Sequence, residues 1–487
     1  MIGTGNIAKQ LATRTNAVIL KQKRSRTPHI ASRQLAGAKT ISAAFQPFRV
    51  GSLGNFPYYW QHPANLTFNA KTYRWISASL KANTYPIQLS QPFTNLYISA
   101  LSKVNYSLSN SDQSKLNQAQ SNIINQQGSL LKAWQAAYGT IPARTETQEP
   151  IDIVIDTITQ TWATPPITLT QLQTSHDING LLNNVPMSGK SVLPVLVNYL
   201  NALQSSVSLV NAATMNRGYL QQALTAVQKP SMTNGALQTS DGGIKPAYRV
   251  NTPLDTILRS LNSTDTGNIV TLNMSVVRSA ENRYSVDMND GTTETLPMSD
   301  FLSIYGEDGV DLFRSIFASD SDKAIVNATF KGVTTIHFGP AYFSSADKTN
   351  WYWIPPIKQA LENGDKDISG FKFSPKPQID FSNTGPFSFL TGVVISKRVS
   401  LTITAKCANY KSIAKQIKSM DSTHLNFLGM PVGSTRGDSP GHQASISTND
   451  KETSLSINFE PSREITADSI DSTAFVLGVQ TNYPTSS

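Results

Sequence analysis

The chain has 487 residues, enough for two or three domains, and only 15% of them are charged against a usual quarter. The single cysteine, Cys407, excludes a disulfide framework and a cysteine-based zinc site, and six histidines leave little for a histidine-rich metal centre. The sequence contains no run of about 18 apolar residues, so it predicts no membrane-spanning helix. The N-terminus also lacks the apolar core of a secretory signal. We therefore expect an intracellular protein.

Charge is distributed unevenly along the chain. The net charge is +9, yet residues 1–111 hold thirteen basic residues and no acidic one, whereas the rest holds 28 basic and 32 acidic residues. The first acidic residue is Asp112. A nucleic acid repels carboxylates, while each Lys or Arg releases counterions condensed on phosphate. We expect the first 44 positions to contact nucleic acid through Lys9, Arg14, Lys21, Lys23, Arg24, Arg26, Arg33 and Lys39.

Residues 1–44 are rich in Ser, Thr, Ala and Gln, and this composition predicts a flexible basic arm. Three other interpretations stay open. One is a solvated basic tail, another is a nuclear signal at 21–26, and the third is a cleaved mitochondrial presequence, for which Ile7, Leu11 and Val18 have the spacing of one helical face. A presequence would account for only the first third of the acid-free stretch.

Aromatic residues crowd together between positions 45 and 75. Aromatic side chains can stack on nucleic-acid bases, but they also bury the most area in cores and subunit interfaces. Pro57 and Pro63 bracket a compact stretch without an RNA-recognition signature, so we favour packing. The residues expected to anchor the arm or to form an interface are Phe56, Tyr58, Tyr59, Trp60 and Trp75.

Helical periodicity follows the aromatic block. Ser109 with Asp112 predicts a capping box at the start of an amphipathic helix of about seven turns, which Gly139 ends. A second long helix is expected at 194–228, with Pro194 in its first turn, one apolar face, and Gly218 as a position where it could break. A shorter helix is expected at 252–261.

The second half of the chain mixes periods. Alternation from Val270 to Met288 predicts a β-hairpin that ends in the turn signal Asn289-Asp290-Gly291. Further strands are expected at 324–338, 399–405, 455–459 and 475–479, helices around 299–317 and 356–362, and a Gly/Ser/Pro-rich loop at 429–448. The fold class expected is α+β, helix-dominated, with a helix-rich first half.

Motifs for catalysis fail on specific points. Gly3-Thr4-Gly5 has no preceding strand, and Gly189-Lys190-Ser191 lacks a glycine that a phosphate-binding loop requires, so it is better interpreted as a helix N-terminus. Asp287 and its neighbours miss the register of a calcium loop, and Cys407 follows a strand-like run, which favours a buried inert thiol. We expect a non-enzymatic protein without catalytic residues, metal or cofactor.

The segment Phe56-Pro57-Tyr58-Tyr59-Trp60-Gln61-His62-Pro63-Ala64-Asn65, with the chain length, the basic arm and the helix-rich region, resembles the capsid proteins of partitiviruses, most nearly the alphapartitivirus branch of plant cryptic viruses. The resemblance implies an icosahedral shell of protein dimers, with a helical shell domain and a smaller mixed α/β protruding domain. It also implies that the shell encloses double-stranded RNA and a polymerase in the host cytoplasm. No catalytic residue is implied.

On this basis we expect four parts: a basic arm at 1–44, a helix-rich shell part at 45–264, a mixed β-containing candidate protrusion at 265–345, and a mixed part at 346–487 that completes the body. The expected partners are further copies of the chain, genomic RNA and an encapsidated polymerase, with no membrane. A rival interpretation is a membrane-binding or pore-forming protein that uses the amphipathic helix 194–228. The near absence of Lys and Arg before Arg217 counts against it.

Overall fold

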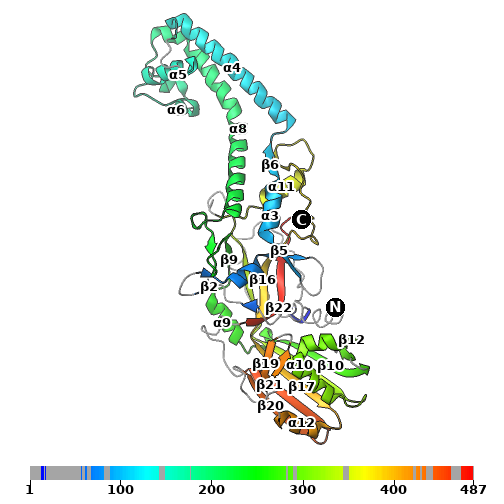
Figure 1. Ribbon diagram of the computed structural model, residues 1–487. Coiled ribbons are helices and arrows are strands. Elements are labelled where there is room, and N and C mark those ends of the chain that lie inside the picture. The colour runs from blue at the N-terminus through cyan, green and yellow to red at the C-terminus, as the bar shows by residue number, and fades with distance from the viewer. Residues whose placement is uncertain are drawn as a thin grey trace. The chain divides into compact units, whose positions relative to one another are not determined.

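The computed structural model of the chain (Figure 1) describes residues 13–15, 17, 56–57, 61–62, 67–81, 88–141, 148–175, 177–280, 283–288, 293–343, 350–419, 424–427, 430–434, 442–461 and 473–485. It mixes helices and strands, which confirms the coarse fold class. The chain forms two compact units. Unit 1 comprises Met1–Ser102, Ala223–Ile354 and Pro377–Ser487, and unit 2 comprises Lys103–Gln222 and Pro355–Lys376.

Unit 1 contains two large antiparallel sheets. The seven-stranded sheet has the order β12 (Thr293–Pro297), β11 (Arg283–Asp287), β10 (Val270–Ala280), β13 (Lys323–Lys331), β17 (Arg398–Lys406), β21 (Ser454–Pro461) and β20 (His442–Asn449). The five-stranded sheet has the order β1 (Phe56–Pro57), β22 (Thr473–Asn482), β16 (Phe389–Ser396), β14 (Thr334–Pro340) and β9 (Tyr248–Val250). Strands far apart in sequence therefore lie side by side.

Alternation along the strands explains how the seven-stranded sheet is covered. In β10, Leu272 and Met274 are buried, while Thr271 and Asn273, which alternate with them along the strand, are only half-buried. Two helices, α10 (Met298–Ile316) and α12 (Tyr410–Ser419), touch each other and lie beside this sheet (Figure 1), and both bury apolar side chains, among them Phe313 and Ile413. Most side chains on the opposite face are polar, such as Thr271, Asn273 and Asn327.

An aromatic cluster fills the core beside the five-stranded sheet. Phe93 and Tyr97, from α3 (Phe93–Leu101), meet Trp351 and Phe389, with ring centroids 5.1 Å apart for Phe93 and Phe389 and 5.3 Å apart for Tyr97 and Trp351. The indole nitrogen of Trp351 donates to the carbonyl of Ala247 at 2.7 Å, so this buried polar atom is satisfied.

Small elements complete unit 1. They are the helices α2 (Ala70–Ile76) and α9 (Leu254–Asn262), the 3₁₀ turns η3 (Met232–Asn234) and η4 (Thr266–Asn268), and the strand pairs β2 (Gln61–His62) with β3 (Thr67–Phe68), β4 (Ala78–Lys81) with β5 (Gln88–Pro92), β7 (Leu237–Gln238) with β8 (Ile244–Lys245), and β18 (His424–Phe427) with β19 (Met430–Ser434).

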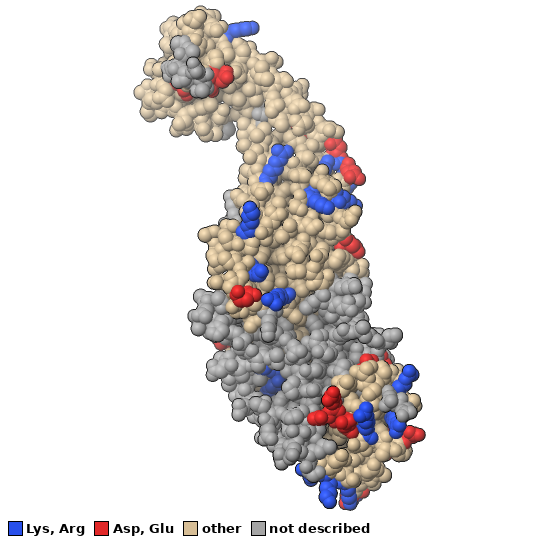
Figure 2. Space-filling view, viewed as in Figure 1, with Lys and Arg blue, Asp and Glu red and all other residues tan. Residues whose placement is uncertain are grey.

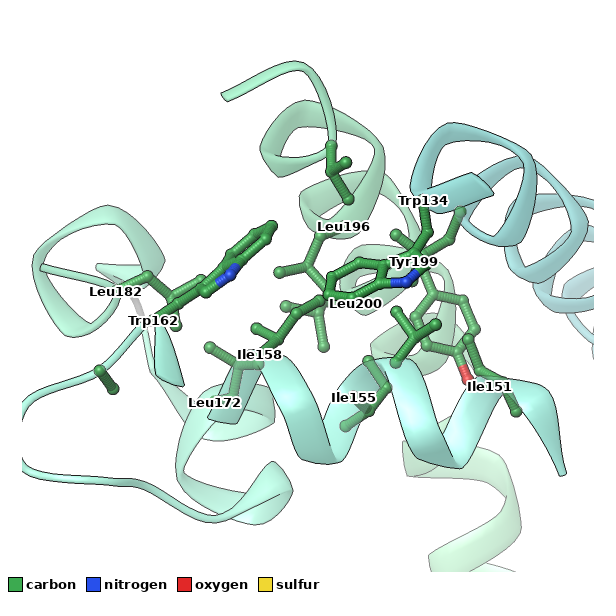
Figure 3. Close-up of a cluster of buried hydrophobic side chains, with 14 residues drawn as sticks. Trp134, Ile151, Ile155, Ile158, Trp162, Leu172, Leu182, Leu196, Tyr199 and Leu200 are labelled. Carbon is green, nitrogen blue, oxygen red and sulfur yellow. The ribbon is translucent and has the colours of Figure 1, made fainter. Parts of the chain in front are cut away.

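Unit 2 is mainly helical. Its helices are α4 (Asn110–Tyr138), α5 (Pro150–Thr161), α6 (Leu169–Thr174), α7 (Ile178–Leu181), η2 (Met187–Ser191), α11 (Pro355–Asn363) and α8 (Leu193–Gln228) up to Gln222, and it holds one strand pair, β6 (Val104–Ser107) with β15 (Gly370–Phe373). Side chains from α4, α5, α6 and α8 form a buried hydrophobic cluster (Figure 3). Within it Trp134 and Trp162 stack with ring centroids 5.8 Å apart.

Both long helices were predicted from their sequence pattern. Helix α4 begins after Ser109, whose hydroxyl accepts from the main-chain NH of Asp112 at 3.1 Å, and it ends at Gly139, whose φ of 81° favours glycine. The predicted capping box is only half correct, because the Asp112 carboxylate accepts from the Ser369 hydroxyl. Helix α8 confirms the prediction for 194–228. The break at Gly218 is wrong, since the helix runs through that residue.

In the second half, β11 and β12 pair antiparallel on either side of the predicted turn Asn289-Asp290-Gly291, which itself lies outside the described residues. The run before this turn is not one strand as predicted, because it divides into β10 and β11, which pair with each other. The predicted loop at 429–448 is wrong, because β19 and β20 occupy most of its described part. Strand β20 is the edge of the seven-stranded sheet, where one face of a strand meets solvent and can be rich in Ser and Thr.

The four expected parts do not coincide with the two units. Residues 265–345 share both sheets of unit 1 with other segments, since β13 pairs with β17 and β14 pairs with β16 and β9. Within 45–264, unit 2 takes residues 103–222. The roles given to these parts concern an assembled particle and stay predictions.

Candidate interaction surfaces

Arg14 is the only predicted phosphate-binding residue within the described part of the arm. Its side chain is half-buried, and its guanidinium donates to the main-chain carbonyl of Thr271 in β10 at 2.5 Å. Arg14 therefore anchors the arm to unit 1. The residues outside the description, whose role stays a prediction, are Lys9, Lys21, Lys23, Arg24, Arg26, Arg33 and Lys39.

The aromatic block supplies part of the core of unit 1. Phe68 and Tyr73 are buried with their rings edge to face, 6.1 Å apart, and the Tyr73 hydroxyl donates to the carbonyl of Pro246 at 2.8 Å. Burial raises the pKa of Tyr73 well above its usual range. Packing therefore accounts for these two aromatic residues of the block.

The five predicted anchor residues are only partly described. The main chain of Phe56 pairs with Ala474 in β22, and Trp75 is half-buried in α2. Tyr58, Tyr59 and Trp60 lie outside the described residues. An interface role for the five stays a prediction.

An acid-free stretch at 381–420 that is rich in basic residues was not predicted from the sequence. It holds six basic residues, and the three in α12, Lys411, Lys415 and Lys418, are exposed with the spacing of one helical face. Figure 2 shows Lys and Arg side chains at this end of unit 1, with Asp and Glu side chains among them. The ammonium of Lys411 lies 3.0 Å from the Asp450 carboxylate, and this contact raises the pKa of Lys411. The absence of acidic residues from 381–420 was the feature of the sequence from which this basic surface could have been predicted.

The long helices of unit 2 expose an uncharged surface. Residues 116–131 and 191–216 contain no Asp, Glu, Lys or Arg. Helix α4 buries no side chain from Asn110 to Ser129, and between 203 and 219 the only described side chain of α8 that is buried is Ala213. The exposed fractions of apolar side chains here are 67% for Ile124, 45% for Val207, 41% for Val210 and 55% for Met215. Figure 2 accordingly shows few charged side chains on this face.

Among the described helices, α8 is the one that is long and apolar enough to cross a membrane by length and composition, and a quarter of its most apolar window is buried. The N-terminal turns of α8 lie inside the cluster of Figure 3, where Leu196 and Leu200 are fully buried. A packed helix of a water-soluble fold satisfies the same criteria.

The features once considered for chemistry have structural explanations. A Cβ at Gly189 would lie 2.7 Å from the Trp162 ring and 2.9 Å from the Tyr138 hydroxyl, so close packing requires glycine there. Cys407 is buried as predicted, and burial, with a smaller effect of Asp322, raises the pKa of its thiol. Within the described residues, no three His, Cys, Asp or Glu side chains gather to hold a metal.

Comparisons of the chain with known protein families, with curated proteins and with solved structures found no match. The functional conclusion therefore depends on the surfaces described above.

Proposed function

We propose that the chain is a non-enzymatic structural protein that assembles with copies of itself into a closed shell around nucleic acid. The observation that carries the proposal is the stretch 1–111, with thirteen basic residues and no acidic one. When a stretch of chain lies against a polyanion, every Lys or Arg strengthens binding because phosphate attracts it, and every carboxylate weakens binding because phosphate repels it.

The anchoring of Arg14 supports this arrangement. Its contact with Thr271 ties one point of the arm to unit 1. The cluster at 21–26, with Lys21, Lys23, Arg24 and Arg26, follows within about ten residues, which a chain can extend over roughly 35 Å. Because Arg14 is held by Thr271, the basic residues at 21–26 can reach nucleic acid that lies next to unit 1.

The resemblance of the 56–65 segment to alphapartitivirus capsid proteins makes the proposal more specific. The enclosed nucleic acid is then double-stranded RNA, the particle is icosahedral and built from dimers, a polymerase is enclosed with the genome, and the particle is a virion that resides in the host cytoplasm. A helix-dominated shell domain with a smaller protruding domain belongs to this same proposal.

Nuclease protection tests the function. The full chain is expressed, sedimented through a sucrose gradient, and treated with ribonuclease before and after denaturation. We expect a fast-sedimenting fraction whose RNA resists ribonuclease until the protein is denatured, and closed particles in electron micrographs. A chain that sediments slowly and protects no RNA would overturn the proposal.

A second candidate function is membrane contact through α8, favoured by the length and apolar composition of that helix. Flotation of the monomer with vesicles that contain anionic lipid tests it. This candidate would be supported if the wild-type chain floats with the vesicles and a variant with a charge on α8, such as Val210→Glu, does not.

A further inference from the structure

We infer that the uncovered middle turns of α4 (110–129) and α8 (203–219) form a contact with the same turns of a second copy of this chain. The inference rests on the proposed function, because it names the surface through which copies of a self-assembling protein pair. The contact would be isologous, with the same patch contributed by both copies about a two-fold axis.

The first argument is that an apolar stripe on α8 extends beyond the hydrophobic cluster that buries its first residues. In α8, Leu196, Leu200, Leu203, Val207 and Val210 follow each other at alternating spacings of four and three residues, which place them along one seam of a helix. Leu196 and Leu200 are fully buried, Leu203 is half-buried, and Val207 and Val210 are exposed by 45% and 41%. The seam thus continues beyond the cluster of Figure 3, and there Val207 and Val210 remain exposed among the described residues.

Helix α4 repeats the pattern in part. Leu116, Ala119, Ile123 and Leu130 share one face; Leu130 is fully buried, and the other three are half-buried, with Ile123 packed against the cluster. The apolar seam of each long helix is therefore fully buried at one end only, and along the rest it is half-buried in α4 and becomes exposed in α8. A seam of this kind is stable when a further helix packs against it.

The second argument is the absence of charge. A helix that faces only water normally carries Lys and Glu, whereas the cores of protein interfaces are depleted of charged residues. Residues 116–131 of α4 and 191–216 of α8 are uncharged throughout. Arg217, the first cation after this stretch, donates to the main-chain carbonyl of Tyr106 at 3.1 and 3.2 Å. The composition is that of an interface.

The third argument identifies the occupant as a second copy. Amide side chains both donate and accept hydrogen bonds, so a face of amides and apolar groups can pair with its own image, which a singly charged face cannot do. Nucleic acid is disfavoured, because residues 116–131 and 191–216 hold no Lys or Arg for phosphate. A lipid surface is disfavoured as well, because amides are costly to transfer into hydrocarbon, and the flotation test below decides between lipid and a second copy. The amides between 116 and 129 of α4 are Asn117, Gln118, Gln120, Asn122, Asn125, Gln126 and Gln127.

A matched pair of variants tests the inference. Val210→Glu places a charge on the seam, and Ile244→Glu places one on β8 in unit 1 at nearly the same exposure, 41% against 42%. We expect analytical ultracentrifugation of the full chain to show self-association at least about tenfold weaker for Val210→Glu than for wild type or Ile244→Glu, since charges facing each other across a two-fold repel. Circular dichroism checks that each variant is folded.

Cysteine cross-linking gives an independent readout. Cys407 is the only cysteine and is buried, so single cysteines introduced in a Cys407→Ser background report their own surroundings. Val207→Cys or Val210→Cys should yield dimers with a short bismaleimide, and Ile244→Cys should not. Equal association of both Glu variants, absence of seam cross-links, or flotation of wild type with neutral lipid vesicles would each overturn the inference.

The two proposals can fail separately. If wild-type particles protect RNA while Val210→Glu assembles normally, the seam is wrong and the function stands. If the seam cross-links but no fraction protects RNA, the pairing surface stands and the shell function fails.

Discussion

Ser369 shows how one hydroxyl from a distant segment completes a helix terminus. It accepts from the main-chain NH of Ser109 at 2.9 Å and donates to the Asp112 carboxylate at 2.5 Å, while Asp367 accepts from the NH of Asn110 at 2.8 Å. The first turn of α4 is thereby tied to 367–369. The hydrogen bond from Ser369, followed by the hydrogen bond and charge of Lys115, lowers the pKa of Asp112 below its usual range.

We predict that Ser369→Ala lowers the melting temperature of the protein by a few degrees at pH 7, because the Asp112 carboxylate loses its strongest donor. A carboxyl whose pKa is lower in the folded than in the unfolded state stabilises the fold above its unfolded pKa of about 4 and stops doing so as the pH falls through its folded pKa. The difference between wild type and Ser369→Ala should therefore shrink below pH 4. Thermal unfolding monitored by circular dichroism measures it.

The matched control is Ser111→Ala, an exposed serine in the same first turn of α4. Its melting temperature should follow that of wild type at both pH values. A difference for Ser369→Ala that is the same at pH 7 and pH 3 would show that Asp112 is not involved.

At the level of elements, two glycines in helical segments of the same region have opposite reasons to be there. Gly189 in η2 packs against Trp162, so it has no room for a side chain, whereas a Cβ at Gly218 in α8 would meet nothing within 4 Å. The first glycine is required by packing. Among the described residues, none packs where a side chain at Gly218 would lie.

We predict that Gly189→Ala lowers the free energy of unfolding by about 1–3 kcal/mol, the usual cost of overpacking. Gly218→Ala should instead raise it by about 0.5–1 kcal/mol, because alanine loses less backbone entropy in a helix. Urea unfolding of both variants measures the change. A stable Gly189→Ala would mean that Trp162 can move aside.

Local pattern was enough to predict α4 and α8, whose period and end signals lie within one segment. It was not enough for α12 or for β20, a short helix and an edge strand in Gly-, Ser- and Lys-rich sequence. The order of the sheets could not be predicted at all, because pairings such as β13 with β17 join residues about 70 positions apart. Of the two proposed contact surfaces, the basic arm could be predicted from the distribution of charge in the sequence. The contact surface of unit 2 could not, because only the structure shows which residues of the apolar stripe are exposed.

For the whole molecule, two acid-free stretches are rich in basic residues, with thirteen before Asp112 and six at 381–420, whereas the acid-free stretch 178–240 holds only three. Only the first belongs to the proposed contact with RNA. The lysines of α12 lie on a helix face beside Asp450, which already pairs with Lys411. The two stretches are distinguished by the salt dependence of binding.

We predict that replacing Lys21, Lys23, Arg24 and Arg26 by Gln lowers the magnitude of the slope of log affinity against log salt by about 3.6, since each of the four phosphate contacts contributes about 0.9. Replacing Lys411, Lys415 and Lys418 by Gln should leave the slope unchanged. Filter binding of the full chain to double-stranded RNA at several salt concentrations measures both. The reverse result would move the RNA contact from the arm to α12.

The place of β22 in the five-stranded sheet has a consequence for folding. This strand, Thr473–Asn482, lies between β1 and β16, so Phe56 has its strand partner, Ala474, 418 positions further along the chain. Contacts between residues so far apart in sequence form slowly, because a long loop must close first. A chain cut anywhere between these two strands would lose an inner strand of the sheet, so the two ends of unit 1 are expected to become ordered together.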